Sequence, residues 1–182
     1  MSIYTYSGKT LDLINVSPND ICAEDIAHAL SRLCRASGQF KHFYSVAQHS
    51  LNCMKEAYAR GFSRRVCFAA LLHDASEAYI ADLPRPVKEL LPDYMEIEKR
   101  VQDAVYKKFG LWPLSDEEKW LVRLVDDACL WYEFKMIHTM PLQFEKIPNL
   151  ATRPDVGKRD IESIEQMFLR EINAFTKLKL TA

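Results

Sequence analysis

The residue pair with the clearest chemical potential is His73-Asp74, which follows the longest purely apolar run of the sequence, Phe68 to Leu72. Such a run predicts a buried segment, and polar groups buried without partners cost several kcal/mol. A divalent metal ion would compensate both side chains. Imidazole nitrogens together with carboxylate oxygens suit Mn, Fe, Co, Ni or Zn, whereas Mg and Ca prefer oxygen ligands throughout.

Two other segments offer further ligands. His49 lies at the edge of the apolar face of an expected helix, from where it can point toward the central segment. Asp126 and Asp127 interrupt an otherwise apolar stretch later in the chain. Residue chemistry alone leaves either aspartate as the fourth ligand, and it leaves a buried polar cluster without metal as the alternative.

The elements that must position these residues are mainly helices. Apolar residues recur at helical spacing over six segments, and caps or glycines mark several of their ends. The expected helices cover about 18–35, 43–60, 63–79, 93–109, 115–140 and 160–177. Ser115 followed by Glu118 predicts a capping box at the start of the fifth.

The segments between the helices are short or irregular. Residues 3–16 alternate loosely around a Ser-Gly-Lys turn and predict a short N-terminal extended arm or hairpin. Pro84 and Pro86 predict an irregular connection, and residues 141–157 predict a surface loop. We therefore expect an all-α fold in a single domain over residues 1–182.

Composition excludes several classes of protein. The chain has 182 residues with 24 basic and 25 acidic side chains, and this balance argues against a nucleic-acid polymer as partner. Its five glycines are far apart, so no glycine-rich phosphate loop is available and phosphate would have to be bound by a metal or by cationic side chains. No apolar run is long enough to span a membrane. The five cysteines form no CxxC motif, which favours buried thiols in a cytoplasmic protein.

The series His49, His73-Asp74 and Asp126 resembles the H…HD…D signature of the HD-domain metal-dependent phosphohydrolases. The resemblance extends to YSVAQHS (44–50) and ALLHDASEAYIADLPRPVK (70–88), and it covers about residues 18–140. It is strongest to the 5′-deoxynucleotidase branch and to small dATP-hydrolysing proteins. It implies one HD-domain helical bundle.

The same resemblance implies a role for each matching residue. His49, His73, Asp74 and Asp126 would hold one divalent transition metal (Mn, Co, Fe, Ni or Zn). Asp126 is favoured over Asp127 because Glu133 follows Asp126 seven residues later, as family sequences often show. Glu77 and Asp82 match catalytic carboxylates, and Lys88 matches a phosphate-binding lysine.

Arg32 and Arg35 are candidates for a second phosphate contact, since a guanidinium fork matches phosphate geometry. The 5′-deoxynucleotidase branch has an Arg-Trp pair in this region. Here Leu33 follows Arg32 and Ala36 follows Arg35. The sequence therefore departs from the family pattern where the sugar and base are selected.

The function that the resemblance implies is hydrolysis of phosphate from small deoxynucleotides by a 5′-deoxynucleotidase-like phosphomonoesterase. One alternative is a dNTP triphosphohydrolase, whose phosphate tail would contact Lys41, His42, Arg85 and Lys88. A second alternative is a non-catalytic nucleotide or metal sensor. Relatives commonly assemble as homo-oligomers, so we expect a homo-oligomer with a small-molecule nucleotide substrate and no membrane partner.

Overall fold

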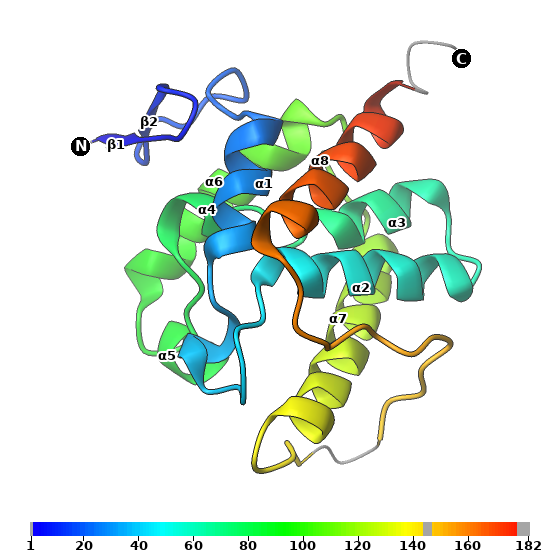
Figure 1. Ribbon diagram of the computed structural model, residues 1–182. Helices are drawn as coiled ribbons and strands as arrows, with labels where there is room; N and C mark the ends of the chain where they lie inside the picture. The colour runs from blue at the N-terminus through cyan, green and yellow to red at the C-terminus, as the bar shows by residue number, and fades with distance from the viewer. Residues whose placement is uncertain (1, 144–146, 178–182) are drawn as a thin grey trace.

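Helices make up most of the structure, as the apolar periodicity predicts. The structure is a computed structural model that describes residues 2–143 and 147–177 (Figure 1). A two-stranded antiparallel hairpin, β1 (Ser2–Tyr4) and β2 (Thr10–Asp12), precedes the helices. The α-helices are α1 (Ala23–Arg32), α2 (Val46–Ala59), α3 (Arg64–Leu71), α4 (Glu77–Ile80), α5 (Arg85–Lys88), α6 (Pro92–Lys108), α7 (Asp116–Ile137) and α8 (Ile161–Lys177). The expected all-α fold with an N-terminal hairpin is thus confirmed.

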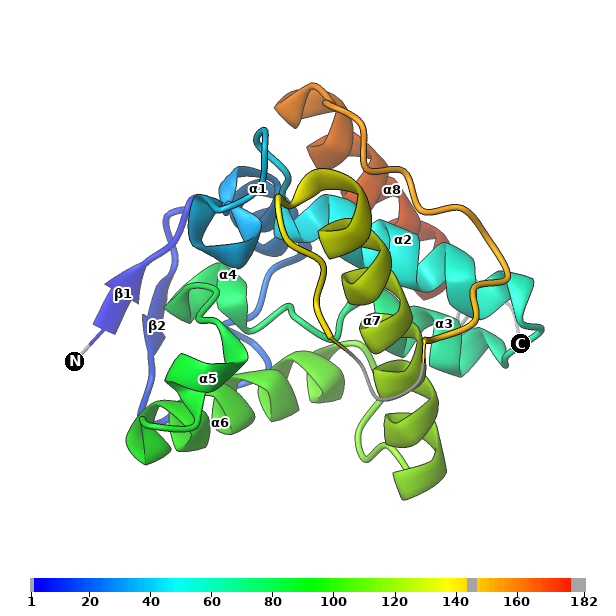
Figure 2. The ribbon, with the colours of Figure 1, turned by 90° about the horizontal axis from the view of Figure 1, so that it is seen from below.

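Helix α2 occupies the centre of the molecule and packs against α1, α3, α7 and α8 (Figures 1 and 2). Ser45 caps its first turn by accepting a hydrogen bond from the backbone N–H of Gln48. The apolar run Phe68 to Leu72 is buried, and Phe68 stacks on Phe175 of α8 with ring centroids 4.5 Å apart. The apolar core therefore surrounds the segment that delivers His73 and Asp74.

The expected helix over 63–79 is wrong in its middle, because α3 ends at Leu71 and α4 begins at Glu77. A continuous helix would pair the N–H of Ser76 with the carbonyl of Leu72. The side-chain amide of Gln102, on α6, takes both groups instead: its Oε1 accepts from Ser76 N–H at 3.0 Å, and its Nε2 donates to Leu72 O at 2.7 Å. His73 and Asp74 consequently lie on a tight turn rather than on a helix.

The first helix also ends earlier than expected. After Arg32 the backbone becomes extended, and Cys34 pairs with Ser45 in an isolated antiparallel bridge. A short 3₁₀ turn, η1 (Arg35–Gly38), follows, in which Ala36 and Ser37 have positive φ angles of 54° and 50°. Arg35 is therefore not on α1 but at the start of a sharp turn.

Residues 149–157, which we call the strap, run along α2 (orange in Figures 1 and 2). Three polar side chains spaced four residues apart on α2, those of Gln48, Asn52 and Glu56, hold the strap's backbone. Glu56 accepts from the N–H groups of Ala151 and Thr152 at 2.8 Å, and Gln48 donates to the carbonyls of Asp155 and Gly157 at 3.0 Å. The expected loop over 141–157 is confirmed outside residues 144–146, which lie outside the described residues.

The start of α7 and the connection at Pro84 and Pro86 are also predicted from the sequence. The capping box is confirmed, because the hydroxyl of Ser115 accepts from Glu118 N–H and the Glu118 carboxylate accepts from Ser115 N–H. The connection at Pro84 and Pro86 is not irregular throughout, since it contains α5. Across residues 2–143 and 147–177, none of the helices combines the length and the apolar character that a membrane span requires.

Candidate active site

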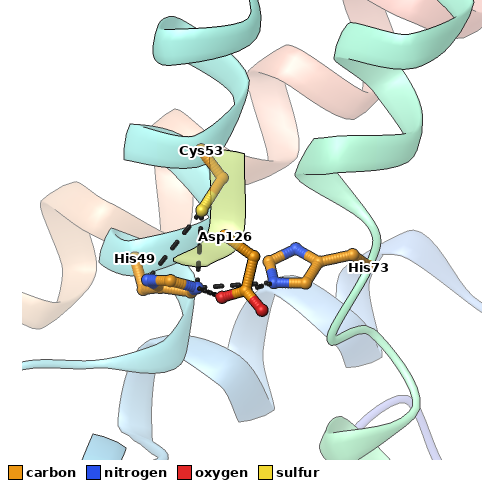
Figure 3. A group of neighbouring side chains, drawn as sticks. All are labelled: His49, Cys53, His73 and Asp126. Atoms are coloured by element: carbon orange, nitrogen blue, oxygen red, sulfur yellow. Dashed lines mark hydrogen bonds and ion pairs between the residues drawn. The ribbon is translucent and has the colours of Figure 1, made fainter. Parts of the chain in front are cut away.

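Four predicted ligands converge from three parts of the fold. His49 comes from α2, His73 and Asp74 from the turn after α3, and Asp126 from α7 (Figure 3 shows three of the four). His49 Nε2 lies 3.4 Å from His73 Nε2 and 3.1 Å from Asp126 Oδ1. Asp74 Oδ2 lies 3.2 Å from His73 Nε2 and 3.8 Å from His49 Nε2. The structure therefore brings all four predicted ligands together.

The spacing of these donor atoms fits a metal ion. Transition metals bind imidazole and carboxylate at about 2.1 Å, which places neighbouring donors roughly 3.0–3.4 Å apart in octahedral or tetrahedral geometry. The distances of 3.1–3.4 Å match that range, and those of 3.7–3.8 Å are slightly longer. The donor set of two nitrogens and two oxygens matches the chemistry expected from the sequence.

Each histidine is oriented by a bond to its other ring nitrogen. His49 Nδ1 lies 2.6 Å from Glu133 Oε1, and His73 Nδ1 lies 2.8 Å from the carbonyl of Ala70. Burial raises the pKa of Glu133, but His49 and Arg35 outweigh burial and lower it, so the carboxylate is charged and accepts. Such partners fix a ligand's tautomer and direct Nε2 to the centre.

Arg35 is inserted between the carboxylates of this cluster. Its guanidinium lies 3.2 Å from Asp74, 3.5 Å from Asp126 and 3.1 Å from Glu133, and only 8 % of the residue is exposed. Burial opposes ionisation of Asp74, but His73 and Arg35 outweigh it and lower the pKa of the carboxyl. Arg35 thus compensates the negative charge and also lines the adjacent cavity.

Cys53, which the sequence predicts only to be a buried thiol, is a neighbour of the metal-ligand cluster. Its Sγ lies 3.4 Å from His49 Nε2, so it is grouped with His49, His73 and Asp126 in space (Figure 3). Burial and then Cys129 raise the pKa of this thiol well above its ordinary range. Because the thiolate is the metal ligand, Asp74 is the better fourth donor. The five cysteines of the described chain are free.

Asp127 points away from the cluster. Its carboxylate lies 3.2 Å from Arg85 and 3.7 Å from Arg123 on the surface of α7. Asp126, one residue earlier, contacts both histidines. The geometry therefore favours Asp126 of the two candidates that the sequence left open.

The buried Glu77 and the half-buried Lys88 form an ion pair beside the cluster. Lys88 Nζ lies 3.0 Å from Glu77 Oε1 and 2.5 Å from Glu98 Oε1. Glu77 is 4 % exposed, and its Oε2 has no hydrogen-bond partner among the residues that the structure describes. Burial, together with Asp74 and Asp82, raises the pKa of Glu77 well above its ordinary value. A buried oxygen without a partner beside a candidate metal centre marks a position for a water or a substrate group.

Asp82 lies across the same cavity. Its Oδ2 accepts a hydrogen bond from the backbone N–H of Ala36 at 3.3 Å. Burial raises the pKa of Asp82, and Asp74 raises it further, whereas Arg35 acts in the opposite direction. The carboxyl is therefore placed to hold a proton more strongly than an exposed aspartate.

The backbone before Asp82 is strained. Ala81 has φ 75° and ψ 158°, a region that is essentially restricted to glycine. Its carbonyl accepts from Tyr94 Oη at 2.7 Å.

Ala81→Gly removes this strain and is expected to stabilise the fold by about 1 kcal/mol. The relief of strain is partly offset because glycine gives the unfolded chain more conformational entropy. Urea unfolding measures this change, with Ala78→Gly inside α4 as the control, which is expected to destabilise; a loss of stability in Ala81→Gly would contradict the prediction.

Two cations expected at the substrate are held elsewhere. The Arg32 guanidinium pairs with Glu162 and Glu165 of α8, so the structure does not bring it to the cluster. His42 Nε2 lies 2.9 Å from the carbonyl of Val156 in the strap. The phosphate contact proposed for Arg32 is therefore not supported by its position, because glutamates on α8 already neutralise it.

A cavity of about 460 Å³ opens onto the cluster. Its lining includes the charged groups Arg35, Asp74, Glu77, Asp82, Arg85, Lys88 and Asp126. It also includes the apolar residues Ala36, Leu83, Pro84, Pro86, Leu130, Phe134 and Leu142. A ligand with both charged groups and an apolar body fits such a lining.

The metal affinity of this site is expected to rise with pH. Burial disfavours the charged form of His73, but Asp74 and Asp126 outweigh it and raise the pKa of the imidazole well above 6.5. A metal binds the neutral imidazole. Below the raised pKa it must displace a proton, so affinity should fall by up to about tenfold for each pH unit of acidification. Competition with a chelating dye at pH 6 and 7 measures this; equal affinities would contradict it.

The fold is similar to that of a solved HD-domain protein. The structure superposes on the cyanophage S-2L HD phosphohydrolase (DatZ), determined with dA and one catalytic Zn²⁺ ion, with a TM-score of 0.50 and 18% identity over 82% of this chain and 81% of that chain. At that identity the likeness establishes the HD-domain fold. No protein-family model matches the chain.

Sequence relatives agree with this resemblance. The uncharacterized protein YfdR of Escherichia coli K12 is 42% identical over 112 residues, which cover 62% of this chain and 60% of the relative. The 5′-deoxynucleotidase YfbR of Escherichia coli O1:K1 is 31% identical over 122 residues, covering 56% of this chain and 61% of the relative. The chain thus spans about 60% of the length of these relatives. The expected resemblance to HD-domain phosphohydrolases and to the 5′-deoxynucleotidases is confirmed.

Proposed function

We infer that the chain is a metal-dependent phosphohydrolase that removes phosphate from small deoxynucleotides, most simply as a 5′-deoxynucleotidase-like phosphomonoesterase. The observation that carries this inference is the buried Glu77 carboxyl, which presents an oxygen without a partner among the described residues beside four convergent metal donors. A site that only binds metal has no need of such a group.

His49, His73, Asp74 and Asp126 would hold the metal, whose identity among Mn, Co, Fe, Ni and Zn the donor set leaves open. A bound divalent metal polarises phosphoryl oxygens and lowers the pKa of water in its coordination shell. Arg35 and Lys88 line the cavity and would bind the phosphate oxygens. The chain's own cations thereby orient the phosphorus for attack.

Glu77 and Asp82 would move the protons. Water attacks the phosphorus and the P–O bond to the sugar oxygen breaks. Glu77 accepts the proton of the water through Oε2, and Asp82 donates its proton to the leaving oxygen. The raised pKa of both carboxyls suits these roles near neutral pH.

The apolar part of the cavity lining would bind the nucleoside. Phe134 and Leu130 on α7 belong to this lining, together with Ala36 and Leu83. DatZ was determined with dA bound, and YfbR is named a 5′-deoxynucleotidase. Both support a deoxynucleotide as the substrate class.

A panel assay tests the proposal. The protein is stripped of metal, reloaded with Mn, Co or Zn, and incubated with dNMPs, NMPs and dNTPs while phosphate and nucleoside are measured. Turnover of dNMPs to nucleoside and phosphate is expected. No turnover of any compound despite stoichiometric metal would overturn the proposed catalytic function and favour a non-catalytic nucleotide or metal sensor.

A dNTP triphosphohydrolase is the second candidate, because the cluster opens on a second side. Another cavity, of about 510 Å³, includes His73 and Asp126 in its lining and carries the cations Lys99, Lys119 and Arg123. These side chains, rather than Lys41 and His42, would contact the outer phosphates. Release of triphosphate from dNTPs, in preference to phosphate from dNMPs, would establish this alternative.

Two expectations from the sequence stay predictions. Homo-oligomerisation is checked by light scattering of the purified protein. A cytoplasmic location is checked by fractionation of cells that produce it.

A further inference from the structure

A directional chain of hydrogen bonds, which we call the relay, connects the strap to the metal ligand His49. It begins at the backbone of Asp155, whose N–H donates to Asn52 Oδ1 at 3.1 Å and whose carbonyl accepts from Asn52 Nδ2 at 2.9 Å. These two bonds fix the orientation of the Asn52 amide. Its nitrogen must therefore face Tyr44, whose hydroxyl it contacts at 2.9 Å.

The direction of every later bond follows from this orientation. An amide nitrogen only donates, so the Tyr44 hydroxyl accepts from Asn52 and directs its own hydrogen to Glu133 Oε1, 2.9 Å away. Glu133 Oε1 also receives Nδ1 of His49 at 2.6 Å. Tyr44, His49 and Glu133 are fully buried, so water does not compete for these bonds.

We propose that the Asp155 peptide, acting through Asn52 and Tyr44, sets the tautomer and orientation of His49, which makes Asn52 and Tyr44 positioning residues of the metal centre. Glu133, held by Tyr44 at Oε1 and by Arg35 at Oε2, accepts the N–H of His49 at Nδ1. The lone pair of Nε2 then faces Asp126 and His73. The strap thereby helps to position the metal ligand His49, although the hydrogen bonds of the strap reach it only through Asn52, Tyr44 and Glu133. This inference rests on the metal site of the proposed function.

Two substitutions interrupt the relay at different steps. Tyr44→Phe removes one hydroxyl, and Asn52→Asp keeps the shape but replaces the donating nitrogen by an acceptor. Loss of a partner that orients a ligand typically lowers metal affinity about 10–100-fold, and we expect this loss of Zn²⁺ affinity in both variants. Competition with a chelating dye measures the dissociation constants.

Gln48→Glu is the matched control. Gln48 also donates to strap carbonyls, those of Asp155 and Gly157 at 3.0 Å, but its side chain is not part of the relay. The same amide-to-carboxylate change therefore loosens the strap and adds the same charge without touching Tyr44. Its Zn²⁺ affinity should stay within about threefold of the wild type. Circular dichroism verifies that each variant is folded.

An NMR measurement separates positioning from a general loss of packing. In the Zn²⁺-loaded wild type, a proton on Nδ1 of His49, assigned by its absence in His49→Gln, should be protected from exchange with water. It should exchange faster in Tyr44→Phe and Asn52→Asp but not in Gln48→Glu.

The outcomes distinguish the relay from the site it serves. Wild-type affinity and exchange in Tyr44→Phe and Asn52→Asp would overturn the relay and leave the proposed function intact. An equal loss in Gln48→Glu would also overturn it, because the strap would then act through packing alone. Failure of the wild type to bind any divalent metal would instead defeat the proposed function.

Discussion

Glu77→Gln is expected to lower kcat for the preferred nucleotide by about 10²–10⁴-fold, the usual contribution of a general acid or base. The substitution keeps the shape of the side chain and its contact with Lys88 but removes its ability to accept a proton. Glu77 is not among the four donors, so metal content should remain stoichiometric. Steady-state kinetics with parallel metal analysis checks both parts.

Glu98→Gln is the control for this variant. Glu98 is the other carboxylate partner of Lys88, at 2.5 Å, but it is not among the residues that line the cavity of about 460 Å³. Its loss alters the charge around the lysine in the same way as the loss of Glu77. A rate for Glu77→Gln within a few-fold of the wild type, or an equal loss in Glu98→Gln, would show that the proton is transferred by another group.

Asp126→Asn is expected to lower affinity for Mn²⁺ or Zn²⁺ by at least about 100-fold, the upper end of what loss of an orienting partner costs. Asp126 Oδ1 lies 3.1 Å from His49 Nε2. Burial raises the pKa of this carboxyl, but His49 and His73 outweigh burial and lower the pKa well below its ordinary value. An amide has the same shape but no charge, so it is a weaker ligand. Activity should be lost with the metal.

Asp127→Asn provides a neighbouring control with identical chemistry. Asp127 contacts Arg85 and Arg123 on the surface, and exposed ion pairs contribute little. Metal affinity should therefore change by no more than a few-fold. If Asp127→Asn lost the metal and Asp126→Asn retained it, the assignment of the fourth ligand would be reversed.

The sequence predicts the helical fold and the cluster because both depend on short-range patterns. Helical periodicity places α2, α6, α7 and α8 within a few residues of their observed bounds. His73-Asp74 stands out because polar residues after a buried apolar run need partners. His49 is found from its place at the edge of an apolar helical face, whereas residue chemistry leaves Asp126 and Asp127 open and the family resemblance favours Asp126.

What the sequence does not predict is set by contacts between distant residues. Arg35 is expected on a helix, but pairing of Cys34 with Ser45 turns the chain and inserts its guanidinium between Asp74 and Asp126. The roles of Asn52 and Gln102 depend on side-chain hydrogen bonds to distant residues, and these leave no periodic signal in the sequence. Tyr44 lies in the motif YSVAQHS, so its position before His49 was the available hint.

The amide of Gln102 has a consequence for how the metal centre is assembled. Residues 63–79 carry the pattern of one uninterrupted helix, in which His73 and Asp74 would project about 100° apart around the axis. The Gln102 amide replaces the helical hydrogen bond between Ser76 N–H and Leu72 O, so the chain turns here and both side chains reach the same cluster. This replacement requires α6 to be docked. Both side chains can therefore bind one ion only when α6 is docked, so a metal titration also measures this docking.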